Sequence, residues 1–149
     1  MTVAAAVVAK LEAWAAAQPY LVSVYFVQVP GIPPVDQQSG AGRYVVVFPI
    51  SEVWSSSAID AVSSGVVSTV QVTSTVWLTE DFSSPAPEAE FLQAAVKSQL
   101  LDWAPVVDGL LTSPFRHTHA GNLRSDEAIA DRQVIYSFDQ FSLTAQRIL

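Results

Sequence analysis

The segment VVSTVQVTSTVWL, residues 66–78, constrains the fold most, because its polar and apolar side chains alternate with a period of two. One face holds aliphatic side chains and two serines: Val66, Ser68, Val70, Val72, Ser74, Val76 and Leu78. The other face holds hydroxyl and amide groups and ends with an indole: Thr69, Gln71, Thr73, Thr75 and Trp77. Successive side chains of a strand point to opposite faces. The segment therefore predicts an antiparallel strand with one face on a core and one face toward water.

Two other segments carry the helical spacing that could cover such a sheet. The first has an apolar stripe at i, i+4, i+8 and i+11, formed by Val3, Val7, Leu11 and Trp14. It ends before Pro19, because the residue preceding a proline avoids the α region. The second helix is predicted over 86–103, and its buried stripe is Leu92, Val96, Leu100 and Trp103.

The remaining strands are predicted from runs of β-branched and aromatic residues at 20–29, 43–50, part of 110–118 and 132–143. Long loops are predicted at 30–42, which contains three prolines and three glycines, and at 79–87. The serine-rich segment 51–65 is ambiguous, with at most a short helical turn, and 145–149 is a C-terminal tail. The pattern predicts one α+β domain over 1–149, with a mostly antiparallel sheet packed against two main helices.

The composition points to assembly rather than to a membrane or a disordered chain. Of 149 residues, 50% are hydrophobic and 14% are charged, and the mean hydropathy is +0.33. The longest apolar runs are much shorter than the roughly 20 residues of a membrane span. We therefore expect the apolar excess to lie in subunit contacts.

The charge balance argues against a nucleic-acid binder that holds phosphates with clustered lysines and arginines, but it does not exclude DNA passing nearby. There are 14 acidic and 7 basic side chains, for a net charge of −7. Cysteine is absent, which excludes disulfides and thiolate chemistry. The N-terminal run has no basic region before it and contains Lys10 and Glu12, so an amphipathic helix is favoured over a signal peptide, and a cytoplasmic site of synthesis follows.

The candidates for chemistry are few. His117 and His119 stand at i, i+2 and would point the same way in a strand, but a metal site needs a further ligand, for which Asp126, Glu127 or Asp131 are available. A serine triad lacks the GxSxG elbow. The adjacent carboxylates Glu80–Asp81 and Asp126–Glu127 are typical of solvated loops, and no phosphate-binding glycine loop occurs. We expect no enzyme, no cofactor and no metal.

Arginines flank the predicted strands at 43, 116, 124 and 132. They are either solvated or paired with acids of a neighbouring subunit, because a planar guanidinium suits interfaces better than lysine does. The residues chosen as candidate interface positions are Arg43, Trp54, Asp81, Arg116 and Arg124.

The order of these elements resembles the tail terminator proteins of long-tailed (siphovirus-type) bacteriophages, the family of minor tail protein U of phage lambda. The resemblance covers residues 3–144. It rests on the N-terminal helix, the Pro/Gly loop, the strands YVVVFP and VQVTSTVWL, the helix ending LLDW, and the final strand VIYSFDQFSL. The serine-rich 55–64 and the tail AQRIL depart from many members of the family.

The resemblance implies a structural protein of the virion neck without catalytic residues. Such proteins form a hexameric ring that caps the tail tube, stops its polymerisation and joins the tail to the head. The implied partners are other copies of the chain, the tail tube protein and a head completion or connector protein, contacted through 30–42 and 79–87. Genomic DNA would pass through the lumen without sequence-specific binding, and the acidic balance suggests an acidic lumen.

Two alternatives stay open. One is another neck protein or the tail tube protein itself, although no long hairpin of the kind tube proteins use is predicted. The other is a small metal- or ligand-binding enzyme domain that uses His117 and His119.

Overall fold

The computed structural model describes residues 2–36, 40–57, 60–78, 85–126 and 133–148; at 52–57 and 60–64 it describes the backbone only. The elements follow one another in the order α1 (Val3–Ala16), β1 (Ser23–Phe26), β2 (Ala41–Ser57), β3 (Asp60–Leu78), α2 (Ala86–Leu100), β4 (Leu110–Thr112), β5 (Arg116–Ala120), β6 (Arg124–Ser125) and β7 (Gln133–Arg147).

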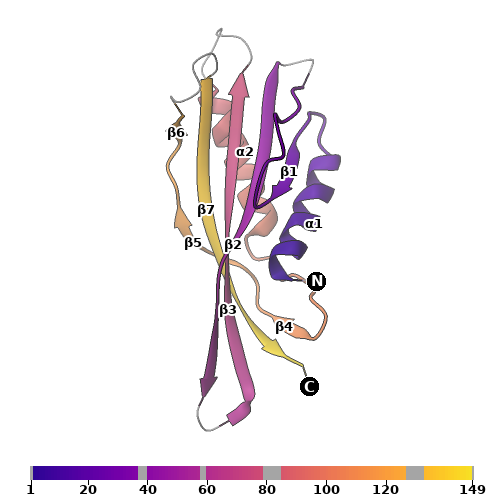
Figure 1. Cartoon of the computed structure of the whole chain (residues 1–149), viewed down its shortest axis with the longest axis vertical. Coiled ribbons are helices and arrows are strands. Elements are labelled where there is room, and N and C mark those ends of the chain that lie inside the picture. The colour runs from indigo at the N-terminus through magenta and orange to yellow at the C-terminus, as the bar shows by residue number, and fades with distance from the viewer. Residues whose placement is uncertain (1, 37–39, 58–59, 79–84, 127–132, 149) are drawn as a thin grey trace.

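The strands form one sheet in the order β1-β2-β3-β7-β4, and β5 and β6 also pair with β7. Among these strands, β1 and β2 run parallel. The other pairs are antiparallel: β2–β3, β3–β7, β4–β7, β5–β7 and β6–β7. Figure 1 shows an elongated molecule in which the ends of β2 and β3 project beyond the body. The predicted α+β class with a mostly antiparallel sheet is confirmed.

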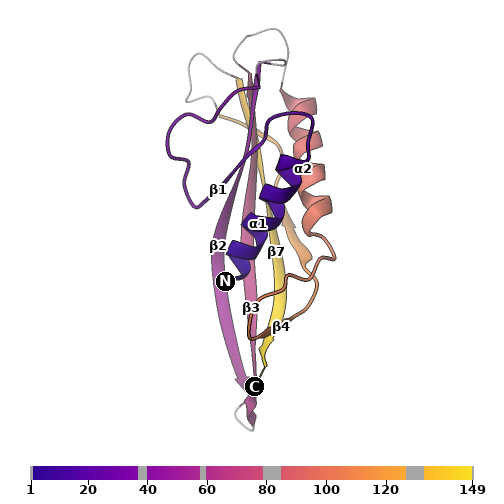
Figure 2. The same ribbon diagram turned by 90° about the vertical axis from the view of Figure 1, so that its right-hand side faces the viewer.

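Both helices cover the same face of the sheet (Figure 2). The core lies between them and this face, and its largest fully buried side chains include Leu11, Leu92, Leu100, Phe115 and Phe141. No helix in the described part of the chain is long and apolar enough to cross a bilayer.

The termini of both helices follow local chemistry. The side chain of Thr2 accepts a hydrogen bond from the amide of Ala5 (3.1 Å), which caps the start of α1. α2 begins after Pro85 and ends at Leu100, earlier than the predicted end at 103. The reason is that Asp102 has a positive φ of 61°, and its amide donates to the carbonyl of Phe115 (3.2 Å) instead of continuing the helix.

The largest error of the sequence prediction concerns 51–65. Residues 51–57 and 60–65 belong to the projecting ends of β2 and β3, strands of 17 and 19 residues, and not to a helical turn; residues 58–59 lie outside the described structure. The register shifts between Pro49 and Ser51, and again between Ser55 and Ser57. A bulge adds one residue to a strand, so the period of two is interrupted at these positions. Two long antiparallel strands therefore exist, contrary to the prediction.

Three smaller predictions are also corrected. The strand predicted at 20–29 is limited to Ser23–Phe26, because Val27 has a φ of 68°. The strand predicted within 110–118 is two strands, β4 and β5, separated at a segment containing Pro114. The tail from 145 extends β7 as far as Arg147.

The two faces of β3 match the predicted pattern. Val66, Val70, Val72 and Val76 are buried toward the helices. We call the opposite face, which carries Thr69, Gln71, Thr73, Thr75 and Trp77 of β3, the open face. Its upper part is not wet: Trp77 is 4% exposed, because part of the loop at 27–36 lies over it and encloses a small cavity with Tyr44 and Val134.

Gly42 is required at this position by its neighbour across the ladder. A Cβ atom on Gly42 would lie 2.2 Å from Nε1 of Trp77, which pairs with Gly42 in register. We expect Gly42→Ala to lower the free energy of unfolding by about 1–3 kcal/mol through overpacking, measured by urea denaturation. The same substitution in a Trp77→Ala background should cost much less. An equal penalty in both backgrounds would show that the indole is not the cause.

Candidate interaction surfaces and buried polar clusters

The two histidines lie on opposite faces of the sheet. His117 pairs with Phe141 and His119 with Gln140, and the register shifts between the two histidines. Adjacent residues of β7 face opposite sides, so this bulge at Thr118 turns His117 toward the helices and His119 to the open face. The prediction that both side chains point the same way is wrong.

His117 belongs to a buried polar network. The Nε2 atom of His117 lies 2.7 Å from Oδ1 of Asp139. Asp139 is buried, with 4% of its surface exposed. The second carboxylate oxygen of Asp139 accepts from Nε2 of Gln93 in α2 (3.1 Å), which also donates to the carbonyl of Gly121 (3.0 Å). Asp139 therefore joins β5, β7 and α2. Within the described part of the chain, no three His, Cys, Asp or Glu residues are grouped to hold a metal ion.

Arg43 lies inside the chain and not on its surface. Its side chain is 7% exposed, and Nη2 donates to Oε2 of Glu88 at 2.8 Å, while the Glu88 side chain is 49% exposed. The guanidinium also lies over the ring of Tyr20, 4.7 Å from its centroid. Burial raises the pKa of Tyr20 above its ordinary value of 10.0; the charge of Arg43 opposes this shift and that of Glu88 adds to it. Arg43 thus connects β2 to the first turn of α2 and to the segment before β1.

The other candidate interface residues divide into two groups. Arg116 and Arg124 are exposed, on β5 and β6. Trp54 lies in β2, but its side chain is outside the described structure, and Asp81 lies outside the described residues altogether.

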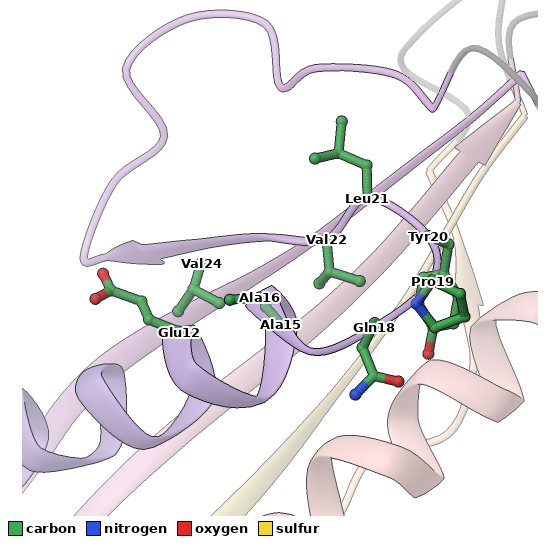
Figure 3. Close-up of a pocket in the computed structure, with 9 residues that line it drawn as sticks. All are labelled: Glu12, Ala15, Ala16, Gln18, Pro19, Tyr20, Leu21, Val22 and Val24. Atoms are coloured by element: carbon green, nitrogen blue, oxygen red, sulfur yellow. The ribbon is translucent and has the colours of Figure 1, made fainter.

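A groove of about 440 Å³ opens between α1 and β1 (Figure 3). Ala15, Ala16, Val22 and Val24 give it an apolar lining, and Glu12 supplies a carboxylate at one end. The lining contains no cysteine, histidine, lysine or arginine, and its ionisable side chains are those of Glu12 and Tyr20. The groove can accommodate apolar side chains of a partner.

Large apolar side chains are exposed on several other parts of the surface. Val106 is 88% exposed, Ile32 74%, Leu111 64% and Ile148 62%. Leu111 pairs with Gln146 in register, two residues before Ile148, so Leu111 and Ile148 are diagonal neighbours on one sheet face. Large apolar side chains that are exposed close to one another are typical of a contact with another protein.

Comparisons with known proteins support the fold. No protein-family model matches the chain, and no curated protein matches it significantly. A chain in the virion of a native gene transfer agent particle has a similar structure, with a TM-score of 0.51, 20% sequence identity, and coverage of 95% of this chain and 94% of that chain. A second solved structure, 16% identical, covers 93% of this chain and 91% of its own at a TM-score of 0.49, and carries no further weight.

Sequence reasoning singled out Arg43 and His117 but missed their partners in the buried clusters. Asp139 is a lone acid in the apolar run VIYSFDQFSL, two residues from Phe141 on the same face, and this was the available signal for a buried carboxylate. Tyr20, Glu88 and Gln93 had no local signal, because their partners are distant in the sequence.

Glu88 should matter more for stability than another acid of the same helix. Glu88→Gln removes the negative charge that faces the buried guanidinium of Arg43, and we expect a loss of about 1–3 kcal/mol in the free energy of unfolding. The matched control is Glu90→Gln, in the same helix and exposed, which should change stability by less than about 0.5 kcal/mol. Equal effects in chemical denaturation would contradict a specific role for the Arg43–Glu88 pair.

The two histidines should respond differently to substitution. His117→Ala leaves the buried carboxylate of Asp139 without one of its donors and should lower stability by about 1–3 kcal/mol, whereas His119→Ala, at an exposed position, should cost less than about 0.5 kcal/mol. Thermal melts with and without added Zn²⁺ should coincide for the unmodified protein. A zinc-dependent rise in Tm that His117→Ala abolishes would instead support the metal-binding alternative.

Proposed function

We propose that this chain is a structural protein of a phage-like virion. Its fold is similar, over nearly the whole of both chains, to that of a chain in the virion of a gene transfer agent particle. A structural role in an assembly is the function that this similarity suggests.

Open strand edges on both sides of the sheet carry the proposal. On one side, β1 pairs with β2 from Tyr44 to Val47, and Val35 forms an isolated bridge with Gly42. Beyond Val47, no described residue pairs with the outer edge of β2. On the other side, β4, β5 and β6 pair with β7 alone. Unpaired edges are templates for a strand of another chain. Because the two edges differ, copies that join through them do so head to tail, which generates a ring if the rotation closes.

Within the virion, we assign the chain to the tail terminator ring. The ring would be hexameric, as in the family that the sequence resembles, and would cap the tube, stop its growth and join the tail to the head. Its partners would be the tail tube protein and a head completion or connector protein, with 30–42 and 79–87 as contact loops. The exposed apolar residues Ile32, Val106 and Leu111 supply surface for such contacts.

The tail tube protein is the second candidate, and the pair of long strands favours it. The sequence predicted no pair of long strands of the kind that tube proteins use. β2 and β3 are long antiparallel strands, and their ends extend beyond the body in Figure 1. Both candidates are virion proteins through which genomic DNA passes, and they differ in whether assembly stops at one ring.

The size and shape of the assembly test the proposal. We expect the purified protein to form closed rings, seen as a discrete mass by light scattering and as annuli by negative-stain microscopy. Thr118→Pro on the outer strand β5 should reduce the ring to folded monomers, because proline blocks strand addition, whereas Thr118→Ala should not. Circular dichroism checks the fold of both variants. Filaments would favour the tube protein, and a monomer at the highest soluble concentration would refute a self-assembling ring.

A further inference from the structure

The open face of the sheet carries its charges along one edge only. The pairing register shows which side chains of β2, β3 and β7 lie on this face. They include Tyr44, Phe48, Gln71, Thr73, Gln140 and Ser142. None of the described side chains that these three strands place on this face is charged. The chain as a whole has a net charge of −7. These three strands therefore depart from the acidic average of this protein, although Asp126, just after β6, lines the open face beside Val134 and Tyr136.

The edge strands β5 and β6 add two arginines and a histidine to this face. Arg116 pairs with Ser142, His119 with Gln140 and Arg124 with Tyr136, so all three lie on the same side as these even-numbered residues of β7. At about 3.3 Å per residue, the row from Arg116 to Arg124 spans about 20 Å. Both arginines are exposed, and neither forms a salt bridge with a described carboxylate.

Two members of the row are held in place by an aromatic ring. The ring of His119 stacks on Phe138, with centroids 5.5 Å apart and planes at 19°, and the guanidinium of Arg124 lies 5.8 Å from the centroid of the same ring. Stacking restricts the rotamers of these long side chains before any ligand arrives. A pre-ordered cation loses less entropy when it binds an anion.

From this geometry, we infer that the Arg116–His119–Arg124 row contacts the phosphate backbone of duplex DNA. The contact is sequence-independent, because contacts to phosphates position a protein on the duplex without reading its bases. The inference rests on the proposed ring, in which each copy contributes one such row to the passage of the genome. It replaces the expected acidic lumen with a neutral wall that carries spaced arginines.

A second copy of the chain is the competing occupant, and the described charges favour it less. Glu12, the ionisable acid of the groove beside β1, lies on α1, and α1 covers the other face of the sheet. Arg116 and Arg124 lie on the open face. Two sheets that continue edge to edge keep their faces aligned, so these arginines would not meet Glu12. A linear polyanion that runs along the open face can meet the whole row.

DNA binding by the assembled protein tests this inference. Fluorescence anisotropy with two labelled duplexes of unrelated sequence should give equal, weak affinities at low salt that fall as salt rises. Arg116→Ala and Arg124→Ala should each weaken binding to both duplexes and reduce the slope of log K against log salt by about 1. The control Lys97→Ala removes one positive charge from α2, on the helix-covered side, and should leave both quantities unchanged.

Light scattering on the same samples separates the possible failures. If the arginine variants assemble normally but bind DNA as the unmodified protein does, or if no binding occurs, the DNA contact is refuted and the ring is untouched. If the variants lose assembly, the row binds a second copy and the inference is overturned. If the unmodified protein is monomeric but binds DNA through these arginines, the contact stands and the proposed ring fails.

Discussion

The pairing of β3 on both of its edges is the constraint on which the rest of the structure depends. Its residues 65–78 are hydrogen-bonded to β2 on one side and to β7 on the other. The ladder with β7 joins residues that are 55 to 81 positions apart in the sequence, from Leu78–Gln133 to Gly65–Gln146. Its closure therefore costs chain entropy, which the buried face offsets. The alternation along β3 fixes which face that is, since a slip of one residue would expose every valine.

Two buried polar clusters then fix α2 on this sheet. Arg43 of β2 pairs with Glu88 in the first turn of the helix, and Asp139 of β7 accepts from Gln93 one turn later. Apolar contacts alone would allow α2 to slide, whereas a buried charge without its partner is costly. The clusters therefore specify the position of the helix more than they add to net stability.

The two helices cover only one face of the sheet, and this has consequences for assembly. The chain has two helices in its described part, and both lie on the same side, so the other side is left to the loop after β1 and to partners. In the described part of the chain, both outer edges of the sheet also include stretches that pair with no further strand. Monomeric proteins normally protect such edges. An oligomer that pairs the edges and encloses the open face resolves both problems, and the cations of β5 and β6 then face the enclosed space.

The sequence by itself determined the α+β class, both helices, and the buried face of β3, because these follow from local periodicity. It also contained the signal for Asp139, a lone acid in an apolar strand. The tertiary structure decided the rest. Bulges near Pro49 and Thr118 interrupt the period of two, so the two long strands and the opposite orientations of His117 and His119 were hidden. The partners of Arg43 come from segments brought together only by folding, which is why a residue expected at the surface lies in the interior.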